Sequence, residues 1–391
     1  MAVLTINAGS SSLKFALFQG ARAVLRGAFE AITDAPTASA TGADGTRLDP
    51  PKVEGVGHEA VLPALLDWVQ QHLEGSAIAA VGHRIVHGGD RFAGPALIDD
   101  AVLTEIEALC PLAPLHQMHN VAAIRAVTAA QPDMPQVACF DTAFHGTMPA
   151  AARRMALPGR LGLRRYGFHG LSYEWIAGRL PPGLAAGRTI VAHLGSGASL
   201  CALLAGCSVD TTMGMTPLDG LVMGTRCGSL DPGAVLYLLQ QRGMTASEVE
   251  HLLYHEAGLL GVSGVSADMR TLHGSAAPMA AAAIDLFAYR VAQDAAGMAA
   301  AMGGIDGLVF TGGIGEHDAQ VRALVCDRLG WMGLAVDAAA PAPGRISPAG
   351  AVAEVWVIPT DEEAVIARQT GGVVKNAELR FRSTQPETIP Q

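Results

Sequence analysis

Four glycine-rich turns constrain the fold of this chain more than any other sequence feature. Each turn lies between apolar runs of strand-like length or directly before a helix-like run. Glycine lets backbone N–H groups approach an anion closely, and the N-terminus of a helix adds a favourable dipole. Several such turns in one chain indicate that one polyphosphate is held from several sides. The segments are Thr5–Phe18, Val191–Leu203, Ala267–Arg270 and Val309–His317.

The first two turns belong to an internal repeat. Ala2–Ile6 and Leu13–Phe18 are predicted strands joined by a Gly-Ser-rich turn, and Thr189–Leu203 repeats the arrangement of strand, Gly-Ser turn and strand. A chain of 391 residues is too long for one ordinary core. The repeat and the length together predict two domains.

Composition excludes several classes of protein. Half of the residues are apolar (50%) and 16% are charged, which is typical of a compact enzyme. The net charge of −10 disfavours a nucleic-acid partner, and the 6 cysteines show no metal-binding spacing, so we expect buried, reduced thiols. The N-terminus has no signal segment, and the most apolar stretch, Ala276–Ile284, is far shorter than the roughly 20 residues that span a bilayer. These features predict a cytoplasmic protein with no membrane partner.

The remaining pattern predicts alternating strands and helices. Polar residues end two short strands, at the sheet edge where open α/β sheets bind ligands. We expect strands at Ala79–His87, Gln136–Phe140, Gly307–Thr311 and Val352–Pro359. We expect helices at Ala60–Leu73, Pro232–Arg242, Thr245–Tyr254, Pro278–Ala301 and Asp318–Leu329, another beginning at Asp361–Gln369, and a frayed tail over Phe381–Gln391.

Eight motifs, in order along the chain, resemble those of the acetate kinase family, within the group that includes sugar kinases, heat-shock chaperone ATPases and actin. They are GHRIVHGG, LAPLH, CFDTAFH, YGFHG, AHLGSGAS, GMTPLDG, MGTRCGSLDP and GGIGE. The similarity extends over nearly the whole chain, from TINAGSSSLKF to PTDEEAVIAR. Eight motifs in register are far more specific than any one of them.

The resemblance implies an α/β fold with a duplicated RNase H-like core, as in actin-like ATPases, and an active site in the cleft between two domains. It implies that residues 1–143 and 363–391 form the domain that binds acetate and metal, and that residues 144–362 form the nucleotide-binding domain. The implied reaction is reversible, Mg²⁺-dependent phosphoryl transfer from ATP to acetate, giving acetyl phosphate and ADP by direct in-line transfer. The implied assembly is a homodimer.

Arg84 and Arg226 are the first candidate catalytic residues. Acetate is already ionised at neutral pH and needs no general base, but bringing it to an anionic phosphate requires converging cations. An arginine binds carboxylate and phosphate oxygens bidentately, whereas an arbitrary arginine is more often a surface ion pair. The resemblance implies that these two arginines hold the acetate carboxylate and the transferring phosphoryl group.

Three histidines and one aspartate complete the catalytic candidates. Because the chain has 13 histidines, a single one is uninformative, but His116, His169 and His193 lie within motifs. The resemblance implies that His169 donates to the phosphoryl oxygens and that the other two support it. Asp141 follows a strand, where it can orient Arg84 or hold a metal-bound water. An aspartyl-phosphate intermediate is the alternative.

Asn7 and Glu362 are the candidate metal pair for Mg²⁺, for which Mn²⁺ can substitute. Glu362 can equally be a carboxylate that stabilises the first turn of a helix. The spacing of Ser10, Ser12 and Lys14 fits a two-strand phosphate hairpin rather than a P-loop, because a strand follows the turn. The other candidates for binding ATP or ADP are His193, Leu194, Gly195, Ser196, Gly197, Asp268, Met269, Arg270, Gly313, Ile314, Gly315, Glu316 and His317.

A small apolar pocket is expected to set the size of the acceptor. The resemblance assigns it to Val86, Leu115, Phe168 and Pro217. Such a pocket distinguishes one methylene by only about 1–3 kcal/mol, so the choice between acetate and propionate stays open. The chain departs from the family pattern at Ser196 and His317, where asparagine is usual, and at Gln117-Met118, where Asn-Pro is usual. The departures at Ser196 and His317 concern the nucleotide contacts and leave the preferred phosphoryl donor undetermined.

Three other functions compete with this interpretation. A propionate or butyrate kinase would differ only in its acceptor. An actin-like or chaperone-like ATPase would use the nucleotide as a switch, but the chain has no separate peptide-binding domain and the paired arginines would have no acceptor anion. A sugar kinase would need a catalytic aspartate beside residues that bind hydroxyl groups, which an apolar pocket does not provide.

Overall fold

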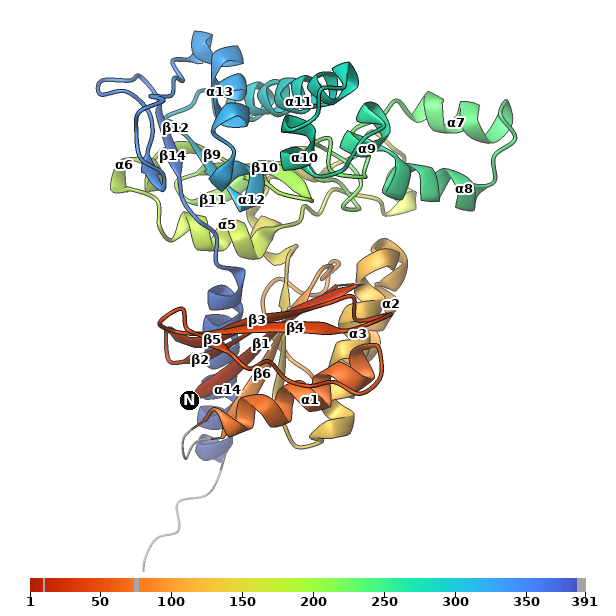
Figure 1. The fold of residues 1–391 in the computed structure, drawn as a ribbon, viewed down its shortest axis with the longest axis vertical. Coiled ribbons are helices and arrows are strands. Elements are labelled where there is room, and N and C mark those ends of the chain that lie inside the picture. Colours follow the sequence, from red (N-terminus) through yellow and green to blue (C-terminus); the bar gives the residue numbers. More distant parts are fainter. Residues whose placement is uncertain (10, 74–76, 385–391) are drawn as a thin grey trace, which may run out of the picture. The chain divides into compact units, whose positions relative to one another are not determined.

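The computed structural model describes residues 1–9, 11–73 and 77–384, and the chain divides into two compact units (Figure 1). The first unit contains Met1–Ala143 and the segment that begins at Asp361. The second contains Phe144–Thr360. Among the described residues, no helix has the length and apolar character needed to cross a bilayer.

The first unit is built on an eight-stranded sheet of order β5-β4-β3-β2-β1-β6-β8-β7. Strands β1, β2 and β3 are antiparallel, whereas β1, β6 and β8 run parallel. The strands are β1 (Ala2–Ala8), β2 (Ser12–Gln19), β3 (Arg22–Glu30), β4 (Thr37–Gly42), β5 (Arg47–Leu48), β6 (Ile78–Ile85), β7 (Ala96–Leu97) and β8 (Gln136–Phe140).

Helices cover both faces of this sheet, which explains why β1 is apolar along nearly its whole length. Leu4 and Ile6 belong to a core with helices α1 (His58–Gln71) and α3 (Pro114–Ala130). Val3, on the opposite face, packs with Ala367 of α14 (Glu362–Thr384).

The second unit has a six-stranded sheet of order β11-β10-β9-β12-β14-β13. Helix α5 (Gly170–Ala177) contributes Tyr173 and Ile176 to a core with Val191 and Val309 of this sheet. Its strands are β9 (Arg188–Leu194), β10 (Ala198–Leu204), β11 (Cys207–Thr211), β12 (Gly307–Thr311), β13 (Gly344–Arg345) and β14 (Glu354–Val357). The remaining α-helix of the first unit is α2 (Asp100–Ala108). Those of the second unit are α4 (Ala150–Arg153), α6 (Pro182–Ala185), α7 (Pro232–Gln240), α8 (Ala246–His251), α9 (Gly258–Ser263), α10 (Met269–His273), α11 (Pro278–Met302), α12 (Gly312–His317) and α13 (Ala319–Arg328).

The two sheets share one topology, so the internal repeat predicted from the sequence is confirmed. The order β3-β2-β1-β6-β8 in the first unit corresponds to β11-β10-β9-β12-β14 in the second. In both, the first three strands are antiparallel and the last two run parallel to the first. This five-strand order is that of a duplicated RNase H-like core.

One helix in each unit comes from the part of the sequence that follows the other unit's sheet. Helix α5 follows β8 of the first unit in sequence but packs on the sheet of the second, and α14 follows β14 but packs on the first. Each core is therefore completed by a helix from the other half of the chain.

The structure revises two predictions about helices. Helix α14 continues to Thr384, so residues 381–384 are helical rather than frayed, and the rest of the predicted tail lies outside the described residues. The helix expected over Thr245–Tyr254 is two pieces: α8 begins at a capping box formed by Thr245 and Glu248, and a π-helical turn follows over Leu252–Glu256.

Candidate active site

Arg84 lies at the centre of a polar cluster in the first unit. Its Nε and Nη2 atoms donate to Oδ2 of Asp141 at 2.9 and 2.6 Å, and its Nη1 donates to Oδ1 of Asn7 at 3.2 Å. Glu362, the first residue of α14, has Oε2 3.9 Å from the same Nη1. Asn7, Arg84 and Asp141 lie at or just after the ends of the parallel strands β1, β6 and β8, so one sheet edge brings them together.

Burial and charge act in opposite directions on Asp141. Its side chain is 1% exposed, and burial raises its pKa to about 6, although Arg84 lowers it. Burial lowers the pKa of Arg84, but the carboxylates of Asp141 and Glu362 outweigh this and raise it, so the guanidinium remains charged. The buried Asp141 carboxylate is bound to Arg84 rather than accessible to a substrate. This geometry favours the orienting role over a general base or a nucleophile.

The oxygen atoms of this cluster fit a hard divalent cation. Mg²⁺ prefers amide and carboxylate oxygens together with waters and phosphates, which Asn7 and Glu362 can supply. Oδ1 of Asp141 is buried and has no hydrogen-bond partner among the described residues, so it can accept from a metal-bound water. Nowhere in the described ranges do three or more His, Cys, Asp or Glu residues gather as a metal site.

The hairpin between β1 and β2 lies next to this cluster. The N–H of Gly9 donates to the carbonyl oxygen of Ser12 at 2.8 Å, and Lys14 is paired with Asn7 in the strand register. Ser12 is half-buried and Lys14 is exposed. Ser10, predicted to contact phosphate, lies outside the described residues.

Two buried amides on α3 hold the backbone beyond Arg84, a feature that the sequence analysis did not predict. Oδ1 of Asn120 accepts from the N–H of Val86 at 3.1 Å, and its Nδ2 donates to the carbonyl of Ala8 at 2.9 Å. Gln117 accepts from the N–H of His87 at 3.1 Å and donates to the carbonyl of the same residue at 3.0 Å. The amide at 117, one of the departures from the family pattern, therefore anchors this backbone.

The other candidates in the first unit lie on or near the same elements. His116 is half-buried on α3, and Val86 is buried immediately after β6. The side chain of Leu115, predicted to line the acceptor pocket, lies outside the described residues.

In the second unit, His169, His193 and Arg226 gather around the turn between β9 and β10. The rings of His169 and His193 stack with centroids 4.3 Å apart. A Cβ atom at Gly197 would lie 2.6 Å from Nη2 of Arg226 and 3.3 Å from Nε2 of His169, so a side chain there would displace the Arg226 guanidinium. His169 has φ of 58°, a left-handed conformation that costs a non-glycine residue roughly 1–2 kcal/mol and is often found at functional sites.

The apolar candidates of this unit flank these groups. Nη1 of Arg226 donates to the carbonyl oxygen of Pro217 at 2.6 Å. Phe168, which precedes His169, is buried, and its carbonyl is bonded to His145 at 2.9 Å.

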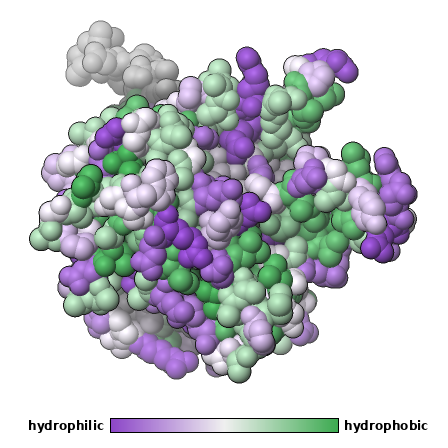
Figure 2. All heavy atoms as spheres, turned by 90° about the horizontal axis from the view of Figure 1, so that it is seen from above, coloured by the Kyte–Doolittle hydropathy of each residue, from purple (hydrophilic) through white to green (hydrophobic). Residues whose placement is uncertain are grey.

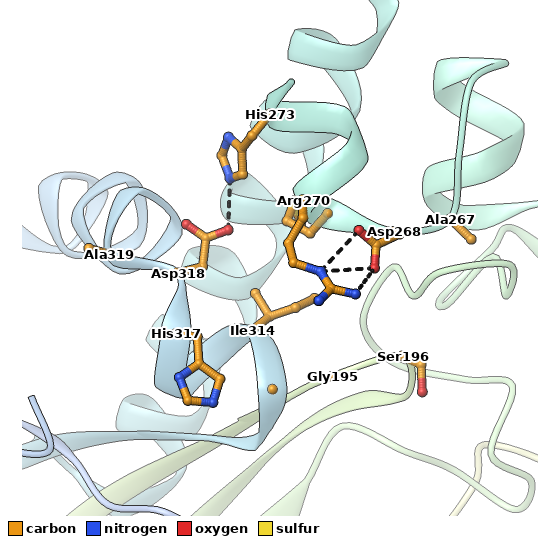
Figure 3. Close-up of a pocket in the computed structure, with 12 residues that line it drawn as sticks. Gly195, Ser196, Ala267, Asp268, Arg270, His273, Ile314, His317, Asp318 and Ala319 are labelled. Carbon is orange, nitrogen blue, oxygen red and sulfur yellow. Dashed lines mark hydrogen bonds and ion pairs between the residues drawn. The ribbon is translucent and has the colours of Figure 1, made fainter. Parts of the chain in front are cut away.

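A cavity of about 690 Å³ in the second unit is formed by the turn after β9 and by helices α10, α12 and α13 (Figure 3). Figure 3 shows α10 on one side and the junction between α12 and α13 on the other. Of the residues predicted to bind nucleotide, those that line it are Gly195, Ser196, Asp268, Met269, Arg270, Gly313, Ile314 and His317.

His273 and Asp318 also line this cavity but were not predicted. His273 Nε2 is 2.7 Å from Oδ2 of Asp318, so this pair joins the two sides of the cavity. Asp318 also caps α13 by accepting from the N–H of Val321 at 2.9 Å. No sequence signal could have identified this pair, because 45 residues separate its members.

Five predicted nucleotide residues of this unit do not line the cavity: His193, Leu194, Gly197, Gly315 and Glu316. Leu194, Gly197 and Gly315 each adjoin a lining residue along the chain. Glu316 accepts from the N–H groups of Gly312 at 2.9 Å and Thr360 at 3.1 Å. Its carboxylate therefore holds the GGIGE turn instead of facing the cavity.

A duplicated RNase H-like fold with a glycine-lined cavity, clustered arginines and histidines, and oxygen donors suited to a divalent cation is typical of nucleotide-dependent phosphotransferases. Comparison with known proteins narrows this class. A sequence model of the acetokinase family matches residues 2–368. The chain is 50% identical to an acetate kinase of Rhodopseudomonas palustris over 94% of its length and 96% of the relative, and 46% identical to one of Nitrobacter hamburgensis over 94% and 95%.

Solved structures agree with these sequence relatives. A crystal structure of Porphyromonas gingivalis acetate kinase matches with a TM-score of 0.84 at 35% identity, covering 95% of this chain and 99% of that one. A propionate kinase from Francisella tularensis matches with a TM-score of 0.88, at the same identity and coverage. The chain belongs to the acetokinase family.

Proposed function

We propose that this protein catalyses the reversible transfer of the γ-phosphoryl group of ATP to acetate, giving acetyl phosphate and ADP. The observation that carries the proposal is the 50% identity to acetate kinases along 94% of the chain. The arginine and histidine clusters support it, because each contains the residues that the reaction requires. The proposal requires both clusters to serve one reaction.

Arg84 supplies one of the two required cations. Acetate arrives as an anion, so the transfer needs charge neutralisation and orientation rather than proton removal. Asp141 and Asn7 bind the Nε and Nη groups and hold the fork in one orientation. Because Asp141 is engaged and buried, direct in-line transfer to acetate explains the cluster better than an aspartyl-phosphate intermediate does.

Arg226 and His169 stabilise the transferring group in this mechanism. Their Nη2 and Nε2 atoms face the backbone of Gly197, where the phosphate hairpin of the second unit turns. Preorganised donors of this kind are worth more than flexible ones, because they need no reorganisation during the reaction. The cavity lined by Gly195, Ile314 and Arg270 accepts the nucleoside portion of ATP.

Asn7 and Glu362 are the residues that would hold Mg²⁺, with Mn²⁺ as a substitute, in the first unit. When bound, the cation neutralises negative charge on the phosphate oxygens. Oδ1 of Asp141, which is buried without a hydrogen-bond partner among the described residues, would accept from a water bound to the cation.

A hydroxamate assay tests the function directly. Purified protein is incubated with ATP, Mg²⁺ and acetate, propionate or butyrate, and the acyl phosphate is trapped with hydroxylamine. We expect the highest kcat/KM with acetate and slower turnover with propionate. Propionate kinase is the second candidate, supported by the similarity to the Francisella enzyme. A clear preference for propionate or butyrate would contradict the proposal, and ATP turnover that is independent of every acid would favour a nucleotide-switched binding protein.

We further propose a homodimer. Helix α7 has no buried residue, and Leu230, Leu236 and Tyr237 on and before it are 45%, 52% and 52% exposed. Figure 2 shows hydrophobic residues on the lobe at the right-hand edge, where Figure 1 places α7 and α8. Apolar side chains gathered on one surface are typical of an interface. Light scattering tests this proposal: a Leu236→Glu variant should be monomeric if the wild type is a dimer.

A further inference from the structure

Each of the two stacked histidines in the second unit is held by a serine hydroxyl. Nδ1 of His169 is 2.8 Å from Oγ of Ser199, and Nδ1 of His193 is 2.8 Å from Oγ of Ser172. Both serines are fully buried, at 0% exposure. A ring nitrogen bonded to a hydroxyl can either donate or accept, so the tautomer depends on where the hydroxyl proton must go.

The proton of Ser199 is directed by Tyr173. The Tyr173 hydroxyl is fully buried, and within the described part of the chain its one hydrogen-bond partner is Oγ of Ser199, at 2.5 Å. Burial raises the pKa of Tyr173 well above its ordinary value, so the phenol stays protonated. Its proton needs an acceptor, and Ser199 Oγ provides one. Ser199 must then donate its own proton to Nδ1 of His169.

The proton of Ser172 is directed in the same way by Thr360. The hydroxyl of Thr360 donates to Oγ of Ser172 at 2.8 Å, which leaves the proton of Ser172 for Nδ1 of His193. Thr360 is itself held by the bond from its N–H to Glu316, at 3.1 Å. The GGIGE turn is thereby connected to the orientation of His193.

We infer that these two hydroxyl relays, Tyr173–Ser199 and Thr360–Ser172, hold both His169 and His193 in the tautomer that carries its proton on Nε2. A proton on Nδ1 would point at an oxygen that already accepts one, and would leave the serine proton buried without an acceptor. The opposite edge of each ring faces the glycine turn. A Cβ atom at Gly197 would lie 3.3 Å from Nε2 of His169, and a Cβ atom at Gly195 would lie 4.0 Å from Nε2 of His193.

The consequence is that the stack presents two N–H donors to an anion at the turn, and that Ser199 and Ser172 are positioning residues for the reaction. This kinetic role rests on the proposed function, whereas the tautomers do not. A neutral N–H donor at Nε2 strengthens its bond as negative charge spreads over the phosphoryl oxygens. The opposite tautomer would present a lone pair to the same anion and repel it.

Long-range ¹H–¹⁵N correlation spectra of the full-length protein with ¹⁵N-labelled histidine test the inference. The His169 and His193 signals are assigned from His169→Asn and His193→Asn variants. At pH 8 we expect the pattern of the Nε2–H tautomer for both rings. The Ser199→Ala variant should give a mixed pattern for His169, and the Ser172→Ala variant should do so for His193. An Nδ1–H or imidazolium pattern in the wild type, or an unchanged pattern in the alanine variants, would overturn the inference.

Kinetics provide the second measurement. Ser199→Ala should lower kcat roughly three- to ten-fold and leave both KM values within about two-fold, since a single hydrogen bond is lost away from the substrates. If this variant does not fold, Tyr173→Phe removes the same relay and should also give a mixed His169 pattern. The control is Ser208→Ala, which removes a similar bond, 2.9 Å long, to Nδ1 of His145. It should leave the His169 signal and kcat unchanged, and an equal effect there would refute a specific role for Ser199.

The spectra are recorded without substrate turnover, so the tautomer assignment and the proposed function can be refuted independently of each other. Absence of acetate-dependent activity in the wild type would refute the proposed function and leave the tautomer assignment intact. An Nδ1–H tautomer in an active enzyme would refute this inference alone.

Discussion

Replacing Arg84 with alanine separates the catalytic role of this residue from its structural role. The substitution removes two hydrogen bonds to Oδ2 of Asp141, at 2.9 and 2.6 Å, and one to Asn7 at 3.2 Å. It also removes a cation from the anionic reactants, for which losses of about 10³-fold or more in rate are typical. We therefore expect kcat/KM for acetyl phosphate formation to fall by about three orders of magnitude.

The same substitution leaves Asp141 as a buried, unpaired carboxylate. Removing one partner of a buried ion pair costs about 3–5 kcal/mol, so Arg84→Ala should melt at a lower temperature than the wild type. Adding Asp141→Asn removes the buried charge. The double variant Arg84→Ala/Asp141→Asn should regain most of the thermal stability while staying inactive. Activity within ten-fold of the wild type in Arg84→Ala, or activity regained together with stability in the double variant, would refute the reasoning.

The pH dependence of this effect has a definite sign. Burial raises the pKa of Asp141 to about 6, above the unfolded value of about 3.9, even with Arg84 present to lower it. Removing Arg84 raises this pKa further. The folded variant then binds more protons than the unfolded chain above pH 4, so its stability falls as pH rises through that window. Thermal melts should show a larger deficit relative to the wild type at pH 8 than at pH 5, and an equal deficit at both pH values would contradict this explanation.

Three further predictions concern the turn, the cavity and the metal. Gly197→Ala should lower kcat at least ten-fold with little loss of stability, because the new Cβ would lie 2.6 Å from Nη2 of Arg226 and push that flexible guanidinium aside. A normal kcat in this variant would show that the guanidinium is not needed at this turn. Asp318→Asn keeps a side chain that can cap α13 but loses the charge that pairs with His273 at 2.7 Å, so KM for ATP should rise roughly three-fold while kcat and KM for acetate stay constant, measured by initial rates. Chelation with EDTA should abolish turnover, and Glu362→Gln should raise the Mg²⁺ concentration needed for half-maximal activity roughly ten-fold; an unchanged Mg²⁺ requirement would exclude Glu362 as a ligand.

Local sequence patterns predicted much of this fold. Strands Gln136–Phe140 and Gly307–Thr311 lie where the apolar runs placed them, and the two Gly-Ser hairpins correctly indicated a duplicated core. Buried strands are short and bounded by turn residues, so their signal is contained in a few neighbouring positions. Helix ends were less well predicted, since α14 continues to Thr384 and the helix expected over Thr245–Tyr254 changes to a π-helical turn at Leu252.

The sequence by itself determined the repeat, the family and the set of residues able to handle phosphate and carboxylate, since glycine turns, strand periodicity and motifs are properties of adjacent positions. Only the tertiary structure decided which of these residues meet. It joined Arg84 to Asn7, Asp141 and Glu362, and it paired His273 with Asp318 across the cavity. It also packed α5 on the sheet of the second unit and α14 on the sheet of the first. Such contacts depend on strand order and helix packing, where distance along the chain carries no information about distance in space.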